Sequence, residues 1–369
     1  MVRCCSGTIR LPDPRAETCR YSVMTQLEGR LVCGLGQAAE FTQIAWVRQQ
    51  LIALVGIDPY PGTVNLALGD EDNQQRWQNW RNTPGLAMAA EAAFCSARCY
   101  PVRVNGRIPA AVVLPELAAY PQDKVEVVAA LPLRRHLALA EGSPLSLELC
   151  GPLKAKTVLF DIDGTLVDSV GAYLEIARIA ARQYGFEVTE AHVRHSLATG
   201  GNFWKAVVPE DCTDGDAIIA ARSAHAARQW PETLREHGRV FTGLAATLDA
   251  LMRQGITLGI VSGARPEVLE LLREDGILER FGCVVLGADV SRRKPHPEGI
   301  LKGLKELRAS ADSAIYVGDT PVDVEAGRAA GVRVVAVLSG AGDSAMMSAQ
   351  EPDRLVHTHA RLAEVIAPW

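Results

Sequence analysis

The chain has 369 residues, of which 48% are hydrophobic and 22% charged, with a formal net charge of −5 at pH 7. This length exceeds a single typical hydrophobic core, so two globular domains are expected. The acidic balance argues against nucleic acid or an anionic membrane as the partner. No apolar run reaches the roughly 18–20 residues of a membrane span, and no signal peptide is recognisable. The nine cysteines include no Cys-x-x-Cys pair, which favours free thiols in a cytoplasmic protein.

The first half of the chain has the pattern of a small β-barrel. Residues 1–24 show no hydrophobic period and are expected to form a loose leader. Short β-type runs separated by Gly and Pro fill 25–150: GRLVCG, GTVNLAL, CYPVRVN, IPAAVVL, KVEVVAA and LSLEL. Between the first two runs, apolar residues on one face predict a helix: Ile44, Val47, Leu51, Leu54 and Val55. A short linker is expected over 151–156.

The second half, 157–369, alternates continuous apolar runs with amphipathic segments. The apolar runs are TVLFDID, TLGIVSG, CVVLGAD, SAIYVGD and RVVAVLS. Helices are predicted over 244–254, 266–275, 297–308 and 321–330. Buried strands that alternate with helices form a parallel, doubly wound α/β sheet. About seventy residues of helical pattern, 169–241, follow the first strand and predict an inserted cap.

Polar residues follow several of these predicted strands. FDIDGTLVD places Asp161 and Asp163 at the end of the first strand, and TLGIVSG ends in Ser262. SAIYVGD ends in Asp319, and the loop RRKPHP supplies Lys294. Because ligands bind at the carboxyl edge of such a sheet, these side chains are expected to meet in one crevice.

This set of residue types predicts phosphoryl transfer. An Asp-x-Asp pair alone also occurs as an ordinary turn at a strand end, so the prediction depends on all four segments together. The carboxylates, with Asp323 of GDTPVD, form an oxygen site suited to Mg²⁺. A carboxylate beside Mg²⁺ and Lys294 can attack phosphorus, because the positive charges neutralise the phosphoryl oxygens.

Over about 157–340 the chain resembles the haloacid dehalogenase superfamily of phosphatases, specifically its members with a helical cap. The resemblance implies that Asp161 is the nucleophile that forms an aspartyl-phosphate. It implies that Asp163 protonates the leaving alcohol and then activates water. Ser262 would bind the phosphoryl group, and Lys294 would hold nucleophile and phosphate together. The implied Mg²⁺ ligands are Asp161, the backbone carbonyl of Asp163, and Asp319, supported by Asp323.

Two features place the resemblance within a smaller part of this superfamily. GDTPVDVEAGRAAGV looks most like phosphoglycolate phosphatases and their near relatives, and an aspartate at position 163 fits phosphatases, since the superfamily ATPases carry Thr there. The cap selects the substrate in this family, so the substrate stays open. ATGGNFWKAV, 198–207, either brings Asn202 or Lys205 to the site or forms a glycine-broken helix junction. Arg194 and His195 are expected to be solvated.

A second candidate site lies in GIDPYPGTVNLAL, residues 56–68. On a strand, Thr63 and Asn65 point to the same face. Their oxygens are neutral ligands for Mg²⁺ carried in by a nucleotide's phosphates. The same residues are equally typical of a β-turn that opens a strand. Gly34 and Gly36 precede the predicted helix, where a glycine loop can cradle phosphates.

The glycine loop, the helix, PYPGTVNL, IPAAVVLPE and the LR segment of VEVVAALPLRRH together resemble the CTP-dependent riboflavin kinases over about 26–150. These are small barrels that transfer phosphate from CTP to riboflavin and make FMN. The resemblance implies that Thr63 and Asn65 bind the Mg²⁺ of the triphosphate and that Gly34 and Gly36 line the nucleotide loop. The remaining implied roles are a place near the flavin phosphate for Arg134 and activation of the riboflavin hydroxyl by Glu126.

The chain departs from this family pattern at three positions. Gln37 and Ala38 stand where an acidic residue and another glycine are usual, and Ala130 replaces a proline. In RWQNWRN, Trp77 and Trp80 either stack on a flavin or pack in the core.

The sequence thus predicts a six-stranded barrel of riboflavin kinase type followed by a capped haloacid dehalogenase domain. The expected function is a cytoplasmic enzyme that uses Mg²⁺ at both sites, phosphorylates riboflavin with CTP, and hydrolyses a small phosphate monoester. The fusion favours flavin-related phosphates for both halves. Two alternatives are a phosphoglycolate-type phosphatase with an inactive amino-terminal domain, or one whose amino-terminal domain senses flavin or CTP.

Overall fold

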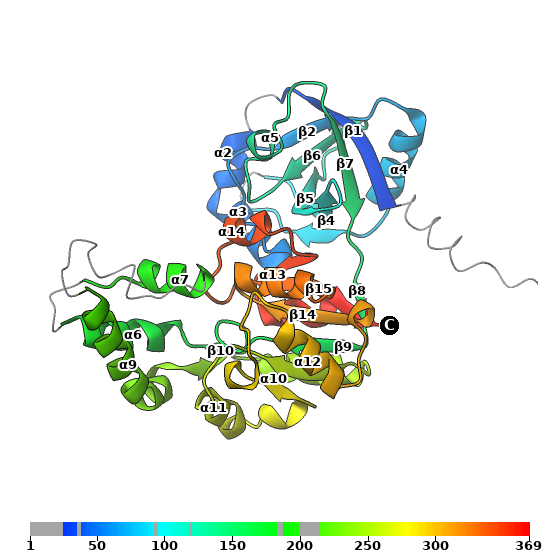
Figure 1. Cartoon of the computed structure of the whole chain (residues 1–369). Helices are drawn as coiled ribbons and strands as arrows, with labels where there is room; N and C mark the ends of the chain where they lie inside the picture. Colours follow the sequence, from blue (N-terminus) through cyan, green and yellow to red (C-terminus); the bar gives the residue numbers. More distant parts are fainter. Residues whose placement is uncertain (1–24, 35–37, 92–93, 119, 183–186, 200–214) are drawn as a thin grey trace, which may run out of the picture.

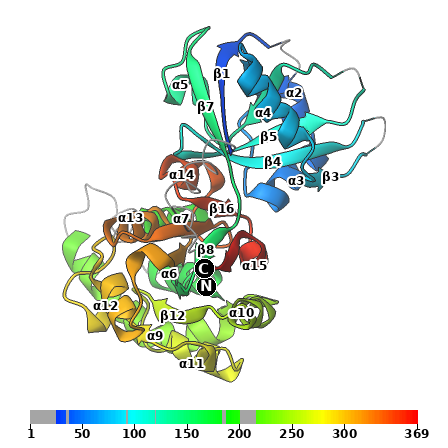
Figure 2. The ribbon, with the colours of Figure 1, turned by 90° about the vertical axis from the view of Figure 1, so that its right-hand side faces the viewer.

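The chain folds into an amino-terminal barrel and a larger α/β part from which a group of helices projects (Figures 1 and 2). The computed structural model describes residues 25–34, 38–91, 94–118, 120–182, 187–199 and 215–369. Within these residues, no helix combines the length and the apolar character that crossing a membrane requires.

The barrel consists of six antiparallel strands that close on themselves. Their order around the ring is β4-β5-β6-β2-β1-β7, and β7 pairs with β4 to complete it. The strands are β1 (Gln26–Val32), β2 (Val64–Ala67), β4 (Ala97–Val104), β5 (Ile108–Pro115), β6 (Lys124–Val128) and β7 (Pro144–Leu149). This confirms the predicted barrel. A seventh strand, β3 (Leu86–Met88), pairs with β4 outside the ring, and its three residues are too few to show a pattern.

The helices of this part cover the outside of the barrel. α2 (Ala38–Gln43) and α3 (Ala45–Val55) occupy the predicted helical region, and α3 buries Val47, Leu51 and Val55. α4 (Glu71–Arg81) was not predicted, because most of its residues are polar. It buries Trp77 and Trp80, which are 0% and 2% exposed and pack in the barrel core. They are therefore core residues, and a flavin cannot stack on them. The short α5 (Leu133–His136) precedes β7.

The α/β part is built on a six-stranded parallel sheet in the order β13-β12-β9-β14-β15-β16. The strands are β9 (Thr157–Phe160), β12 (Thr257–Val261), β13 (Val284–Val285), β14 (Ala314–Gly318), β15 (Arg333–Val337) and β16 (Arg354–Val356). α10 (Leu244–Arg253) and α11 (Val268–Glu274) pack on one face of the sheet. α12 (Glu298–Glu306) and α13 (Pro321–Ala329) pack on the other. The prediction of a doubly wound sheet is confirmed. Five of its six strands were predicted, and β16 was not.

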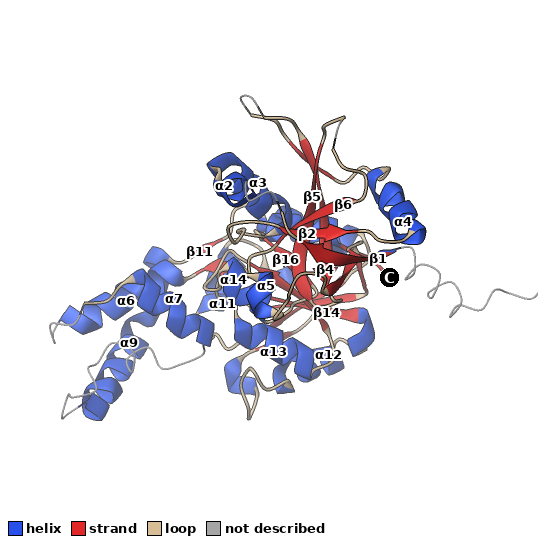
Figure 3. Cartoon of the chain, turned by 90° about the horizontal axis from the view of Figure 1, so that it is seen from above, coloured by secondary structure: helices blue, strands red, loops and turns tan. Residues whose placement is uncertain are grey.

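The predicted cap is present as helices inserted after β9. They are α6 (Val170–Arg182), α7 (Glu190–Thr199) and α9 (Gly215–His237). Two short paired strands, β10 (Val167–Asp168) and β11 (Arg239–Val240), connect the cap to the sheet. Figure 3 shows these helices projecting beyond the sheet on one side. The cap residues Asn202 and Lys205 lie outside the described residues.

The connection between the two parts carries structure of its own. Within 151–156, β8 (Leu153–Ala155) pairs in parallel with β17 (Ile366–Pro368), near the carboxyl terminus. α14 (Ser344–Ala349) and β16 lie on the barrel side of the α/β part (Figure 2). The short α15 (Leu362–Val365) precedes β17.

A buried histidine next to α15 makes stability dependent on pH. His359 is 5% exposed, and its ring centroid lies 5.7 Å from that of Phe241. Burial lowers the pKa of His359, so the native protein keeps this ring neutral while the unfolded chain takes up a proton below its ordinary pKa of about 6.5. We expect the stability of the wild type relative to His359→Phe to fall as the pH falls from 7 to 5. Thermal unfolding of both proteins across this range checks it, and a constant difference contradicts it.

Candidate active sites

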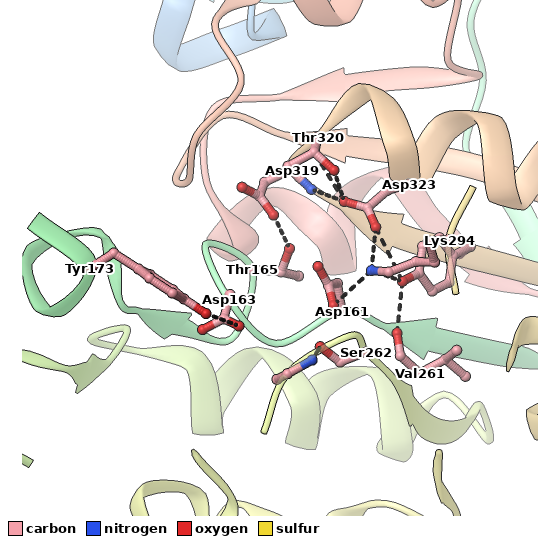
Figure 4. A network of polar contacts seen from close by, with 12 residues as sticks. Asp161, Asp163, Thr165, Tyr173, Val261, Ser262, Lys294, Asp319, Thr320 and Asp323 are labelled. Atoms are coloured by element: carbon pink, nitrogen blue, oxygen red, sulfur yellow. Dashed lines mark hydrogen bonds and ion pairs between the residues drawn. The ribbon is translucent and has the colours of Figure 1, made fainter. Parts of the chain in front are cut away.

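Three adjacent strands of the parallel sheet end in polar residues that converge on one pocket (Figure 4). Asp161 follows β9 and continues the sheet by donating its backbone N–H to the Val317 carbonyl at 2.9 Å. Ser262 follows β12, and its N–H donates to the Val285 carbonyl at 2.9 Å. Asp319 follows β14. The sheet therefore fixes the backbone from which these side chains leave.

Lys294 lies between two of the carboxylates. Its Nζ is 2.9 Å from Asp161 Oδ1 and 2.6 Å from Asp323 Oδ1, and it donates to the Tyr316 hydroxyl at 3.0 Å. Burial lowers the pKa of Lys294, but Asp161, Asp323 and Tyr316 together raise it well above its ordinary value. The ammonium is therefore a fixed positive charge beside Asp161. Tyr316, which donates to the Val261 carbonyl at 2.8 Å, was not singled out in the sequence.

Asp319 and Asp323 are held by the start of α13 and by neighbouring loops. Asp319 Oδ1 accepts from the Thr165 hydroxyl at 3.1 Å, and Oδ2 accepts from the Ala341 N–H at 2.8 Å. Asp323 Oδ2 accepts from the Thr320 hydroxyl at 2.7 Å. Since Lys294 binds the other oxygen of Asp323, this side chain already has partners on both oxygens. It is thus suited to supporting its neighbours.

The donor set at this edge fits a hard divalent cation. Asp161, Asp319 and Asp323 each offer an oxygen, and these oxygens lie within 4.8 Å of one another. Burial raises the pKa of Asp161 to about 6, against the opposing effect of Lys294. Burial, together with Asp323 and Asp161, raises the pKa of Asp319 well above its ordinary value. Buried carboxylates at this spacing gain stability from a cation that prefers oxygen ligands, as Mg²⁺ does.

Asp163 stands on the cap side of the pocket. Its Oδ2 accepts a hydrogen bond from the Tyr173 hydroxyl of α6 at 3.3 Å, and burial raises the pKa of Asp163. A raised pKa suits a carboxyl group that donates a proton. The pocket, of about 240 Å³, has Asp161, Asp163, Ser262, Lys294 and Asp319 on its floor and Val170, Tyr173 and Leu197 of the cap above them. Tyr173 contacts this site from a helix and lies in no recognisable motif.

The Arg194 side chain is 41% exposed and His195 is exposed, in line with the prediction, but Arg194 also contacts a neighbouring loop. Arg194 lies on α7, and its Nη1 donates to the Gly340 carbonyl of the loop that also binds Asp319. Its Nε donates to Glu190 at 2.7 Å. The helical pattern of the cap did not reveal the neighbour that Arg194 contacts across the cap boundary.

We expect Arg194→Ala to lower kcat/KM for phosphate ester hydrolysis by about three- to tenfold, the effect of losing a partly exposed charged hydrogen bond. The loss should appear mainly as a higher KM, because the cap then closes less firmly over the pocket. Steady-state kinetics checks this result. Glu190→Gln is the matched control, since it removes only the ion pair within α7. Equal kinetics for the two variants would contradict the role of Arg194.

The barrel brings together most of the residues assigned to its site. Asn65 on β2 is directly opposite Glu126 on β6, so both side chains lie on the same face. Asn65 Nδ2 is 3.5 Å from the Thr63 hydroxyl. A Cβ on Gly34 would lie 2.4 Å from Asn65 Nδ2, so any other residue there would displace this side chain. Arg134 Nη2 donates to the carbonyl of Val32, the residue paired with Asn65 on the other side.

The side-chain oxygen of Asn65, Oδ1, is buried without a hydrogen-bond partner among the described residues. Asn65 as a whole is 4% exposed. A buried carbonyl oxygen without a partner is costly unless it binds an ion or a donor, so it fits the proposed metal–nucleotide site. Glu126 forms an ion pair with Lys124 at 2.8 Å, a contact that the sequence did not reveal. Gly36 lies outside the described residues.

Comparison with known proteins divides the chain in the same way. The family model of haloacid dehalogenase-like hydrolases matches residues 158–337. A second model matches residues 31–149; it is described as a domain of unknown function, DUF120, and its family label is that of the CTP-dependent riboflavin kinases. The two matches fall on the α/β part and on the barrel.

Curated relatives match the second half of the chain. A phosphoglycolate phosphatase of Xanthomonas campestris is 31% identical over 219 residues, which are 58% of this chain and 96% of the relative. One of Salmonella paratyphi A is 30% identical over 220 residues, 53% of this chain and 86% of the relative. An N-acetylmuramic acid 6-phosphate phosphatase of Pseudomonas putida is 27% identical over 192 residues, which are 51% of this chain and 85% of the relative.

A solved structure shows the same fold. The crystal structure of a predicted phosphoglycolate phosphatase from Haemophilus somnus superposes with a TM-score of 0.52 at 22% identity, over 57% of this chain and 98% of that one. The two family matches and the curated relatives identify the halves of the chain, and this likeness supports the fold of the second half. The chain belongs to the haloacid dehalogenase-like hydrolases and carries a domain of the CTP-dependent riboflavin kinase family ahead of its hydrolase domain.

Proposed function

We propose that the hydrolase domain is a Mg²⁺-dependent phosphatase of small phosphate monoesters that works through an aspartyl-phosphate on Asp161. The observation that carries the proposal is the buried contact of Asp161 with Lys294 beside Asp319, in a pocket that cap residues also line. Asp161, the Asp163 carbonyl and Asp319 would hold the metal, with Asp323 in support. When bound, Mg²⁺ supplies positive charge that offsets the charge of the phosphoryl oxygens.

In the proposed reaction, an oxygen of Asp161 attacks phosphorus while Asp163 gives its proton to the leaving alkoxide oxygen. The ammonium of Lys294 and the hydroxyl of Ser262 bind the phosphoryl oxygens and orient them for the attack. The alcohol departs, and Asp163, now ionised, takes a proton from the water that cleaves the aspartyl-phosphate. Tyr173 orients Asp163 from the cap by its hydrogen bond.

A panel of phosphate esters, assayed with Asp161→Asn as the blank, tests the proposal. The panel includes phosphoglycolate and N-acetylmuramic acid 6-phosphate, which the names of the relatives give, together with FMN and a ribityl phosphate. The last two test whether both domains act on flavin-related phosphates. Equal hydrolysis by the wild type and Asp161→Asn on every ester would overturn the phosphatase.

For the barrel we propose CTP-dependent phosphorylation of riboflavin to FMN. The buried, unpartnered Oδ1 of Asn65 supports a metal site beside Gly34. Thr63 and Asn65 would hold the Mg²⁺ of the triphosphate, Gly34 and Gly36 would line the nucleotide loop, and Arg134 would contact the flavin phosphate side. Glu126, opposite Asn65 in the sheet, would take the proton from the riboflavin hydroxyl as the hydroxyl oxygen attacks the terminal phosphorus of CTP and CDP leaves with the bridging oxygen.

FMN formation from riboflavin, CTP and Mg²⁺ tests the kinase, with ATP in place of CTP as the test of nucleotide preference. Saturable flavin binding without FMN formation would favour a sensor domain, and the absence of both would favour an inactive one. Under either outcome the phosphatase proposal stands alone. The domain boundaries at 25–150 and 157–369 and the cytoplasmic location are parts of this proposal.

A further inference from the structure

The loop between β15 and α14 encloses Asp319. The N–H of Ala341 donates to Asp319 Oδ2 at 2.8 Å, and the N–H of Gly342 donates to the Asp319 carbonyl at 3.0 Å. A Cβ on Gly340 would lie 1.9 Å from Asp319 Oδ2, so backbone and carboxylate touch. Because the loop binds both the side chain and the main chain of Asp319, a displaced loop displaces this carboxylate.

The same loop leads into Ser344, the first residue of α14, which contacts the barrel. The Ser344 hydroxyl donates to the Gly56 carbonyl at 2.8 Å and accepts from the Asp58 N–H at 3.0 Å. Ser344 is 4% exposed, and its hydrogen bond to Gly56 is buried in the interface between the domains, while the one from Asp58 is partly buried. Ser344 follows Gly342 by two residues, and the position of its hydroxyl therefore constrains the end of the loop.

The barrel side of this contact is firmly held. Gly56 ends α3 at φ +68°, and a Cβ there would lie 2.9 Å from the backbone of Leu355 on β16. Asp58 accepts two hydrogen bonds from Arg48, at 2.5 and 2.6 Å. Four residues further on, the N–H of Gly62 donates to Thr42 of α2 at 3.0 Å. The partners of Ser344 are thus fixed by helices of the barrel.

Other polar contacts between the domains lie away from this loop. Arg107 Nε is 2.8 Å from Glu351 Oε2, beyond the carboxyl end of α14, and the Arg107 side chain is 71% exposed. Arg103 Nη1 is 3.3 Å from Asp353 Oδ1, next to β16. An ion pair whose arginine is as exposed as Arg107 contributes little. Arg107 is therefore a matched control, because it crosses the same interface without reaching Asp319.

From these contacts we infer that Ser344 is a positioning residue of the phosphatase, through which the barrel holds the Asp319 loop in place for the metal. The barrel is then a structural part of the hydrolase site. This inference rests on the proposed function, since that proposal makes Asp319 a metal ligand. It adds that a change in the Gly56–Asp58 segment of the barrel alters metal binding in the other domain.

Calorimetric titration of the full-length chain with Mg²⁺ alone tests the inference. Without nucleotide, the neutral oxygens of Thr63 and Asn65 lack the phosphates that bring charge to their metal, so the titration reports the carboxylate site; Asp319→Asn verifies this. Ser344→Ala removes the partner of the buried Gly56 carbonyl and of the partly buried Asp58 N–H. We expect it to weaken Mg²⁺ binding about three- to tenfold, and to raise the Mg²⁺ concentration for half-maximal p-nitrophenyl phosphate hydrolysis equally.

Arg107→Ala should bind Mg²⁺ like the wild type, and Ser344→Thr, which keeps the hydroxyl, should stay within about twofold of it. If Ser344→Ala does not fold, Ser344→Cys replaces the hydroxyl with a weaker donor of similar size and should show the same direction of change. If Ser344→Ala and Ser344→Cys bind Mg²⁺ as Arg107→Ala does, the inference is overturned and the phosphatase stays intact. A wild type without Mg²⁺-dependent hydrolysis above the Asp161→Asn blank overturns the proposed function as well.

Discussion

Asp161→Asn is expected to abolish hydrolysis of phosphate esters, with a loss of kcat on the order of 10⁴-fold or more, as when other covalent nucleophiles are removed. The amide keeps the shape of the carboxylate but cannot attack phosphorus, and its neutral oxygen is a poorer metal ligand. The effect should be on kcat for every ester that the enzyme accepts. Steady-state assays with the best substrate of the panel measure it, and a loss below about tenfold contradicts the role of nucleophile.

The unfolding temperature of Asp161→Asn shows whether its loss of activity comes from misfolding. Burial raises the pKa of Asp161 to about 6, which means that the folded protein disfavours the charged carboxylate relative to the unfolded chain. The sign follows from linkage: stability is lost as the pH rises from the ordinary pKa of an aspartate to about 6, and the loss is complete above it. In EDTA at pH 7.5, Asp161→Asn should therefore unfold at a temperature no lower than the wild type. Adding Mg²⁺ should raise the unfolding temperature of the wild type more than that of the variant.

Asn65→Ala is expected to abolish FMN formation, with a loss on the order of 10²- to 10³-fold in kcat/KM for CTP. The variant removes the buried Oδ1 proposed as a metal ligand, and in phosphoryl transfer the position of the metal and phosphates does most of the catalysis. FMN appearance, followed by chromatography with CTP varied, measures the effect. Asn65→Asp is the informative companion, since it keeps an oxygen in place but adds a charge next to the triphosphate.

The two predictions check each other, because each variant should retain the other activity. Asn65→Ala alters a side chain on the barrel sheet, and Asp161→Asn one at the end of β9, so neither touches the other site. A loss of FMN formation in Asp161→Asn would contradict independent active sites. If riboflavin is not phosphorylated by the wild type at all, Asn65 can still be tested by its effect on CTP binding.

The sequence was informative where a motif coincides with a strand end. Asp161, Ser262 and Asp319 could be placed together because the carboxyl ends of parallel strands share one edge, a rule that needs no coordinates. The barrel likewise followed from short runs of alternating pattern between turns. The helix α4 escaped notice because its polar residues outnumber Trp77 and Trp80, the two that anchor it in the core.

The sequence could not supply the contacts of side chains that belong to no motif. Tyr173 reaches Asp163 from the cap, Arg194 reaches Gly340, and Ser344 reaches Gly56 across the domain boundary. Each side chain has an ordinary sequence context. Their partners depend on how the cap and the barrel pack against the sheet. A periodic pattern along the sequence contains no information about that packing.

The pairing of β8 with β17 bears on how the two activities are to be dissected. A cut between the domains at 151–156 looks natural from the sequence, yet it passes through β8, which pairs with the strand that ends at Pro368. Expressing the halves separately from such a cut would strip the hydrolase of a strand and expose the edge of β17. The two activities are better separated by point substitutions in the intact chain. An affinity tag fused directly to the carboxyl terminus would lie beside the two-stranded sheet of β8 and β17.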